Sequence, residues 1–265
     1  MNRKQHVSDP LAIAQRALLP FYLKPTGTFE LVRLGGPNDG GYLVDQRDVD
    51  ETTLLVALGI NDDWSFERDF LADHPVPLLA YDGSVSPKVF ARRMVQSLAV
   101  GGRGIRKPAR ALLTYGRFFR GPRAHRRSMI GPAGQLWVTS LAEVLEKNTC
   151  PSDRVFLKMD IEGCEYRVLG EIASYKSRIV GLVIEFHDVD LHRSLIEDFI
   201  KKIPLQLAHV HCNNHGNVSA DGTPLVVELS FSSHAPKAIF ESGIPHSLDA
   251  PNNPRRPDFD VEFIA

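Results

Sequence analysis

The stretch "VFLKMDIEGCEYRVL", residues 155–169, changes character in its middle. Its first five residues, Val155 to Met159, form a short apolar run that is typical of a buried strand. The run stops at Asp160, and Glu162 and Gly163 follow before a pattern with helical spacing begins. Two carboxylates and a glycine therefore stand where a buried strand gives way to a helix.

Similar apolar runs alternate with helical patterns through most of the chain. Residues 101–135 give no clear pattern, whereas Ser140 and Glu143 match a capping box at a helix start. The alternation predicts a doubly wound, mostly parallel α/β sheet. Strands are predicted at residues 29–34, 42–44, 53–58, 76–81, 136–139, 155–159, 179–186, 205–211 and 225–231, and helices at 10–19, 65–71, 87–100, 164–172, 191–203 and from 140 onward.

Length and composition narrow the class of protein. A chain of 265 residues suits one α/β domain or two small ones. No apolar run is long enough to predict a transmembrane helix, and residues 1–10 lack the apolar core of a signal peptide. Three widely spaced cysteines argue against a disulfide framework or a cysteine zinc site. We therefore expect a cytoplasmic protein.

The net charge of −1 hides a strong asymmetry. Between Gly83 and Ala142 the chain has no Asp or Glu, whereas it has twelve Lys and Arg there, so the remainder carries −13. This segment is either a solvated insertion or a surface that attracts an anionic substrate, lipid surface or nucleic acid. Arginine dominates over lysine, which favours recognition of phosphate or carboxylate.

Polar residues follow the first two strands of the predicted sheet, where a ligand is expected. Gly59 ends the first run and permits close backbone approach, and Asn61 and Asp62 follow it before a helix N-terminus. Asp82 and Gly83 end the second run. An acid at that position is placed to bind ribose hydroxyls, although Asp82-Gly83 also fits a simple turn.

The next two strand ends carry acids and a histidine. Asp160 and Glu162 could chelate a cation, hold an amino group or orient a base, or Asp160 could cap the following helix. Glu185 and His187 end the fourth run, and His187 can accept a proton near neutral pH.

A second histidine cluster lies in "HVHCNNHG", residues 209–216. His209 and His211 share one face of a predicted strand, as metal ligands could, or they could be core residues with polar partners.

Several of these stretches resemble one enzyme family. "FLKMDIEGCEYRVL" resembles the K-x-D-x-E-G-x-E-x-x-x-L signature of FkbM-type methyltransferases, which use S-adenosylmethionine. "LGINDDWSFE" resembles the first-strand motif of a related branch, and "AYDGS" resembles its "F-D-P-S", with Tyr81 and Gly83 as departures. "NDGGYLV", "IEFHD" and "HCNNHG…VVELSF" also recur in relatives, so the resemblance runs from about Arg33 to Phe231.

The resemblance implies a class I methyltransferase (Rossmann-like) fold whose last strand is antiparallel. Residues 51–235 would then be the methyltransferase domain, with a basic insertion at about 84–135, an N-terminal lead-in of helix and hairpin at 1–50, and an irregular tail at 236–265. It implies methyl transfer to an oxygen, often on a sugar or polyketide.

The resemblance also implies roles for single residues. The cofactor would contact Gly59, Asn61, Asp62, Asp82, Gly83, Asp160 and Glu162. In one mechanism Asp160, with Glu185 or His187, binds Mg²⁺ that acidifies the acceptor hydroxyl. In the other, which needs no metal, His187 or His211 takes the proton.

We expect a carbohydrate or glycolipid acceptor, which could be anionic and used in polysaccharide assembly. Contact with an anionic membrane face through the basic segment and a homo-oligomer are both compatible with the sequence. No nucleic-acid partner is expected, but RNA methylation stays as an alternative function, and so does a non-catalytic module with a degenerate cofactor fold. A dinucleotide oxidoreductase is disfavoured because no GxGxxG follows the first strand.

Overall fold

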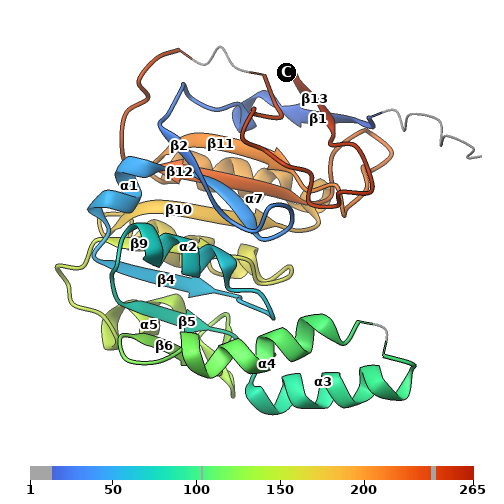
Figure 1. Cartoon of the computed structure of the whole chain (residues 1–265). Coiled ribbons are helices and arrows are strands. Elements are labelled where there is room, and N and C mark those ends of the chain that lie inside the picture. Colours follow the sequence, from blue (N-terminus) through green and yellow to red (C-terminus); the bar gives the residue numbers. More distant parts are fainter. Residues whose placement is uncertain (1–13, 103, 240–242) are drawn as a thin grey trace, which may run out of the picture.

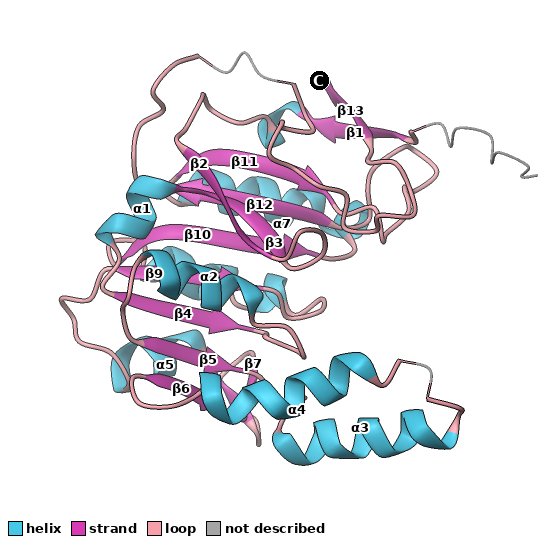
Figure 2. Ribbon diagram, in the orientation of Figure 1, coloured by secondary structure: helices cyan, strands magenta, loops and turns pink. Residues whose placement is uncertain are grey.

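A seven-stranded sheet forms the centre of the protein (Figures 1 and 2). The structure is a computed structural model that describes residues 14–102, 104–239 and 243–265. In spatial order the strands are β11 (Gln206–Cys212), β12 (Val227–Ser232), β10 (Ile179–Phe186), β9 (Val155–Met159), β4 (Leu54–Leu58), β5 (Leu78–Tyr81) and β6 (Arg123–Arg126).

Strand direction identifies the fold. Strands β10, β9, β4, β5 and β6 pair parallel to one another, whereas β12 pairs antiparallel with both β10 and β11. A mostly parallel, doubly wound sheet with its last strand inserted antiparallel is the class I methyltransferase arrangement. The predicted fold class is therefore confirmed.

Both faces of the sheet are covered, which explains the continuous apolar strands. Helices α5 (Leu141–Lys147), α6 (Leu169–Ser174) and α7 (Val189–Lys202) pack on one face through a core that includes Leu145, Ile172 and Phe199. The other face is covered by α2 (Ser65–Asp73), by the hairpin of β2 (Leu31–Gly35) and β3 (Gly41–Asp45), and in part by α3 (Pro87–Ala99) and α4 (Arg106–Phe118). Helix α1 (Gln46–Glu51) follows β3, and the capping box predicted at Ser140 is present at the start of α5.

The prediction of a helix at residues 10–19 is wrong where the structure describes it. Residues 10–13 lie outside the described residues, and Arg16–Pro20 form strand β1. Ala17 and Leu19 are buried on alternate positions, which is the period of a strand rather than a helix. Strand β1, which leads into the short 3₁₀ helix Phe21–Leu23, pairs parallel with β13 (Asp260–Ile264), so the tail expected to be irregular also contains a strand.

The basic segment contributes to the sheet as well as to the surface. Helices α3 (Pro87–Ala99) and α4 (Arg106–Phe118) form a hairpin that projects from the body, and β6 then returns to form the edge of the sheet (Figure 1). The segment is therefore more than an insertion, although the proposed domain limits themselves stay a prediction. The strand expected at residues 136–139 shortens to β8 (Val138–Thr139), paired with β7 (Met129–Ile130).

The predicted helix at residues 164–172 is interrupted. It consists of a 3₁₀ turn, Glu165–Arg167, followed by α6. Among the described residues, no helix is long and apolar enough to cross a membrane.

Candidate active site

A large cavity beside the sheet opens at the carboxyl ends of β4, β9 and β10. It has a volume of about 760 Å³, and we call it the carboxylate pocket after Asp160, Glu162 and Glu185 in its wall. Lys158 and His187 line it too. The pocket lies where ligands bind in open α/β sheets.

Three of the predicted residues meet in this pocket. Asp160, Glu185 and His187 each offer one ligand atom, and these atoms lie within 4.8 Å of one another. The imidazole Nε2 of His187 is 3.7 Å from Glu185 Oε1 and 3.6 Å from Glu162 Oε2. Asp160 follows β9 and lies 25 positions before Glu185, which with His187 stands at the end of β10; the parallel pairing of β9 with β10 brings the three residues together.

Three other polar side chains hold the cluster in place. The Tyr42 hydroxyl donates to Glu185 Oε2 at 3.2 Å and lies 3.5 Å from Asp160 Oδ2. The Asn213 amide donates to Glu185 Oε1 at 3.0 Å. Lys158 Nζ lies 4.0 Å from Asp160 Oδ2 and donates to the carbonyl of Gly59. These contacts fix the carboxylates before any ligand arrives.

The crowded acids favour a positive ligand. Burial raises the pKa of Asp160, and Lys158 and His187 only partly oppose this. Burial also raises the pKa of Glu185 well above its usual range, with the charge of Asp160 adding to the effect. Each ionised carboxylate therefore raises the free energy of the other, and a cation between them would relieve this repulsion.

Glu165 orients both the loop after β9 and His187. Its buried Oε1 accepts hydrogen bonds from the backbone N–H groups of Ile161 and Gly163, both at 3.1 Å. The same oxygen lies 3.2 Å from His187 Nδ1. Asp160 caps no helix here, so its interpretation as an N-cap is wrong.

The protonation of His187 follows from these neighbours. Burial lowers its pKa, but the hydrogen bond to Glu165 and the nearby carboxylates outweigh burial and raise the pKa overall. With Nδ1–H donating to Glu165, Nε2 is the nitrogen that faces the pocket.

The backbone at these strand ends is strained. Asn61, Glu162 and Asp188 have φ values of 41°, 56° and 50°, and each lies within three residues of the end of β4, β9 or β10. Left-handed conformations of non-glycine residues cluster at functional sites, where the surrounding structure holds them. This geometry agrees with a ligand site at the sheet edge.

A second cavity, of about 360 Å³, adjoins the first. We call it the side pocket; it is lined by Gly59, Asp82, Gly83 and Met129, among others. The two pockets share Asn61, Asp160 and Glu162, so an elongated ligand can extend from one into the other.

Asp82 has partners that the sequence did not reveal. Its Oδ2 accepts from the backbone N–H groups of Ile60 and Asn61 at 3.0 and 2.8 Å, and its Oδ1 accepts from the N–H and hydroxyl of Ser84. Burial raises its pKa, but these hydrogen bonds outweigh burial and lower it. Asp82 therefore braces the loop after β4, and its contact with a ribose stays a prediction.

Gly59 is required by the chain itself. Its φ is +82°, and a Cβ there would lie 1.7 Å from the carbonyl oxygen of Asp160. The sequence predicted that another group approaches the backbone closely at Gly59, and in the structure that group is the loop after β9, which begins with Asp160. At Gly83, a Cβ would lie 2.7 Å from the sulfur of Met129. Asp62 lines the carboxylate pocket, and its contact with a cofactor stays a prediction.

His211 does not line the carboxylate pocket, so the structure gives no support to its predicted role as a base. Its Nδ1 lies 3.2 Å from Glu228 and its Nε2 lies 2.9 Å from Asp258, and these acids hold its pKa well above the usual range against the effect of burial. His209 pairs with Asp249 at 3.1 Å. Within the described part of the chain, the two histidines bind carboxylates of the tail and join no metal-type cluster.

Sequence reasoning missed several residues that line the carboxylate pocket or support it. Lys158 and Glu165 belong to the quoted signature, and Tyr42 belongs to "NDGGYLV", yet no role was assigned to them. Glu67 on α2 is buried in the pocket wall, and burial raises its pKa against the charge of Lys158. The presence of these residues in the motifs shared with relatives was the signal that could have found them. Their contacts, however, depend on strands that are distant in the chain.

Comparison with known proteins supports the family. Residues 136–210 match the model described as the Methyltransferase FkbM domain. A comparison with curated proteins gives no match. The match spans β9, β10 and most of β11, and so it contains Asp160, Glu185 and His187.

Comparison with solved structures gives matches to methyltransferases at low similarity. Precorrin-6y C5,15-methyltransferase from Geobacter metallireducens GS-15 is 9% identical, with 72% of this chain and 87% of that chain covered and a TM-score of 0.36. Sp1610 of Streptococcus pneumoniae, a candidate tRNA (m1A22) methyltransferase solved with S-adenosyl-L-methionine, is 11% identical, with 75% of each chain covered and a TM-score of 0.35. The 16S rRNA (adenine(1408)-N(1))-methyltransferase from Catenulisporales acidiphilia is 15% identical, with 72% and 92% covered and a TM-score of 0.30.

These TM-scores are low, so the fold assignment rests on strand order and direction. The family match agrees with the resemblance found in the motifs, and it supports an S-adenosylmethionine-dependent methyltransferase. The chain thus carries an FkbM methyltransferase domain match, over residues 136–210, on a class I methyltransferase fold.

Proposed function

We propose that this protein transfers the methyl group of S-adenosylmethionine to a hydroxyl oxygen of a carbohydrate. The observation that carries the proposal is the cluster of Asp160, Glu185 and His187 in the carboxylate pocket, in which Asp160 also lines the adjoining side pocket. A base and two carboxylates at such a junction suit the deprotonation of a hydroxyl beside a cationic methyl donor.

The side pocket suits the adenosyl part of the donor. Gly59, Asp82 and Gly83 line it, and Asp82 holds the loop after β4 in place through the N–H group of Ile60. S-adenosylmethionine supplies an electrophilic methyl group on a sulfonium cation and also carries an ammonium group. Asp160 and Glu162, which line both pockets, would stabilise these positive charges.

His187 is the proposed general base. Its Nε2 faces the carboxylate pocket while Glu165 holds Nδ1, so the acceptor proton would pass to Nε2 as its oxygen attacks the methyl carbon. The buried carboxylate of Glu165 would stabilise the imidazolium that forms. General base catalysis of this kind contributes roughly 10²–10⁴-fold.

A divalent cation is the second mechanism consistent with the site. Two carboxylates and an imidazole within 4.8 Å are a donor set that suits Mg²⁺ or Mn²⁺, and the crowding that raises the pKa values of Asp160 and Glu185 supports binding of a positive charge. Asp160, Glu185 and His187 would hold the ion. The ion would lower the pKa of a bound hydroxyl, and His187 would then act as a ligand instead of a base.

The polar lining supports a carbohydrate acceptor. Beyond the cluster, the carboxylate pocket presents hydrogen-bonding side chains from Asn38, Asp39, His215 and Asn252. Its volume of about 760 Å³ lies within the range of ligand pockets, and sugars need many directional polar partners.

A methyl-transfer screen tests the proposal. Purified protein with S-adenosylmethionine is offered monosaccharides, oligosaccharides and phosphorylated sugars, with Mg²⁺ and with chelator in parallel. Methylation of a sugar hydroxyl is expected, and its loss with chelator alone selects the metal mechanism. Calorimetric titration that detects no binding of S-adenosylmethionine would contradict both mechanisms and favour a non-catalytic module.

A further inference from the structure

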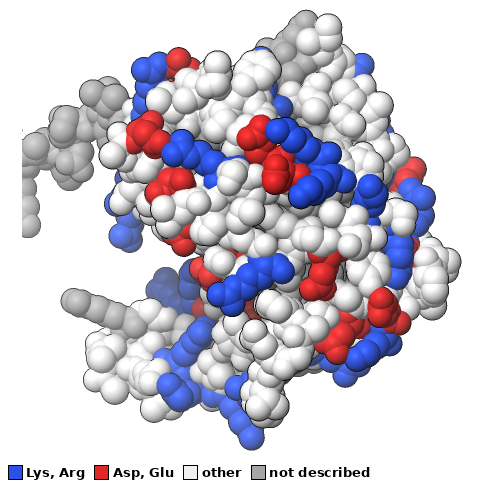
Figure 3. Space-filling view, turned by 180° about the vertical axis from the view of Figure 1, so that it is seen from behind, with Lys and Arg blue, Asp and Glu red and all other residues white. Residues whose placement is uncertain are grey.

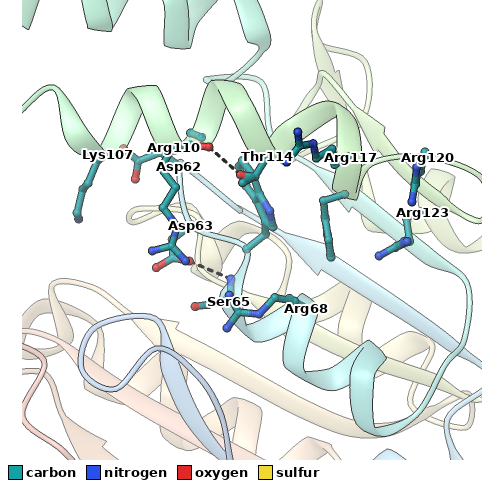
Figure 4. Close-up of a pocket in the computed structure, with 13 residues that line it drawn as sticks. Asp62, Asp63, Ser65, Arg68, Lys107, Arg110, Thr114, Arg117, Arg120 and Arg123 are labelled. Atoms are coloured by element: carbon teal, nitrogen blue, oxygen red, sulfur yellow. Dashed lines mark hydrogen bonds between the residues drawn. The ribbon is translucent and has the colours of Figure 1, made fainter.

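A third cavity lies between helices α2 and α4 and has a volume of about 360 Å³. We call it the arginine pocket. Figure 4 shows Lys107, Arg110 and Arg117 along α4, Arg120 and Arg123 beyond the end of that helix, and Arg68 on α2. All six side chains line the cavity.

Little negative charge balances this pocket. Among the described residues, Arg110, Arg117, Arg120 and Arg123 form no ion pair, and Arg68 pairs with Asp69. Two acids, Asp62 and Asp63, line the wall nearest the carboxylate pocket. Basic side chains also gather over the α3–α4 hairpin when the molecule is seen from behind (Figure 3). Unbalanced like charges around one cavity favour an anionic ligand.

The wall that carries these charges is well anchored. Lys107, Arg110, Thr114 and Arg117 recur at helical spacing and so share one face of α4. Ala111 and Phe118 of the same helix are buried, and the Phe118 ring stacks on Trp64 at 6.2 Å between centroids. The guanidinium of Arg123 lies 5.0 Å from the centre of the Phe118 ring.

The arginine pocket adjoins the proposed site of methyl transfer. It shares Asp62, Asp63 and Lys107 with the carboxylate pocket. Arginine forks match phosphate oxygens in two parallel hydrogen bonds, and several around one cavity suit a phosphate or diphosphate group. A ligand could therefore place a phosphate among the arginines and a hydroxyl beside His187.

We infer that the acceptor is a phosphorylated carbohydrate whose phosphate or diphosphate binds in the arginine pocket. This inference rests on the proposed function and names its substrate class. The phosphate could belong to a nucleoside diphosphate sugar or to a lipid-linked sugar, since both present the same charged group. Phosphate recognition would also select the sugar hydroxyl that reaches the carboxylate pocket.

Titration with inorganic pyrophosphate tests the pocket directly. The chain has two tryptophans, so Trp137→Phe leaves Trp64 in the pocket wall as the fluorescent reporter. In this background, Arg110→Ala with Arg117→Ala should weaken pyrophosphate binding at least about tenfold, since charge-assisted hydrogen bonds are lost. The control, Lys88→Ala with Arg92→Ala, removes the same charge from α3 outside the pocket and should change binding less than about twofold. Equal weakening in both variants would overturn the inference, because it would show only general attraction.

Further binding measurements distinguish this inference from the alternatives. S-adenosylmethionine should bind the Arg110/Arg117 variant as tightly as it binds the wild-type protein. If the wild-type protein itself does not bind S-adenosylmethionine, the proposed function is refuted, rather than the phosphate site. A nucleoside diphosphate that competes with pyrophosphate supports the soluble source, and sedimentation with vesicles of anionic phospholipid, lost in the same variant, supports the lipid-linked source. Binding of single-stranded RNA that is tighter than that of pyrophosphate and equally weakened in both variants would overturn the inference in favour of RNA.

Discussion

At the scale of single residues, His187 has the surroundings that a base in this pocket needs. Glu165 holds Nδ1 at 3.2 Å, while Tyr166 donates to the carbonyl of His187 at 2.5 Å and so fixes the backbone. Replacing His187 by Ala should lower turnover by roughly 10²–10⁴-fold while S-adenosylmethionine still binds. Turnover assays and calorimetry check the two parts separately.

A nearby histidine provides the control for that variant. His192 lies on α7, stacks on Tyr166 and does not line the carboxylate pocket, so His192→Ala should keep most of the activity. Wild-type turnover in His187→Ala would exclude His187 both as base and as metal ligand.

A substitution at Gly59 tests whether stability and ligand binding depend on the close packing of the chain after β4 and β9. Its φ of +82° is unfavourable for alanine, and the added Cβ would lie 1.7 Å from the Asp160 carbonyl. Gly59→Ala should destabilise the fold by about 1–3 kcal/mol and displace Asp160 from the cluster. Urea denaturation measures the first effect, and titration with S-adenosylmethionine measures the second. Full stability with full binding would show that the loop accommodates the methyl group.

At the scale of elements, Gly116 in helix α4 is a glycine for which alanine should have the opposite effect to that at Gly59. Gly116 lies within α4, and a Cβ there meets no atom within 4 Å. Because glycine costs helix stability relative to alanine, Gly116→Ala should stabilise the protein by about 0.5–1 kcal/mol. Urea denaturation measures this change. A loss of stability would mean that other atoms pack more closely around Gly116 than the structure shows.

Helix α1 depends on a buried acid. Asp48 Oδ1 accepts from the N–H and hydroxyl of Ser233, its Oδ2 has no partner, and His234 Nε2 is 3.7 Å away. Burial raises the pKa of Asp48 to about 6, with the charge of Asp45 adding to burial and the serine hydrogen bonds opposing it. Ionising Asp48 therefore costs stability in the folded state.

The sign of the pH effect follows from that raised pKa. The stability that protonated Asp48 contributes is present below about pH 4 and is lost as the pH rises through about 6. Asp48→Asn should therefore gain stability over wild type as pH rises from about 4 to 7, by at most ~3 kcal/mol. Denaturation at both pH values measures this gain, and the exposed Asp50→Asn is the control that should show no such trend. A gain independent of pH would refute the role of Asp48 ionisation.

The element scale also shows where local patterns failed. The apolar periods predicted β4, β9, β10 and α7 to within about two residues. The helix after Asp160 was predicted as continuous, but Glu165 folds back to bind Ile161 and Gly163, so a 3₁₀ turn separates the loop from α6. A side chain that competes for backbone donors is invisible to periodicity.

At the scale of the whole molecule, the C-terminal tail completes the pocket wall. Asn252 and Pro254 line the carboxylate pocket, and Asn252 donates to Glu228 at 2.6 Å. His211 ties the same tail to β11 through Asp258 at 2.9 Å. This part of the pocket wall therefore depends on contacts between strands β11 and β12 and residues 249–258.

Loosening that tail should affect acceptor and donor differently. Asp258→Asn removes one carboxylate from His211, so stability should fall by about 1–3 kcal/mol and hydrogen exchange should quicken in residues 243–264. The KM for the acceptor should rise, whereas the affinity for S-adenosylmethionine, which we propose binds in the side pocket, should stay the same. Asp260→Asn on the exposed face of β13 is the control. Equal weakening of donor and acceptor binding would contradict this division of the site.

The sequence by itself determined the α/β class, most strand and helix positions, and the polar residues at the strand ends. These features depend on local period and on the residues that follow each apolar run, so one chain suffices to show them. Only the tertiary structure decided the strand order and the partners of each polar group. Tyr42 meets Asp160 and Glu185 across 118 and 143 residues, and His211 meets Asp258 rather than the pocket, because long-range packing and not local spacing selects such contacts.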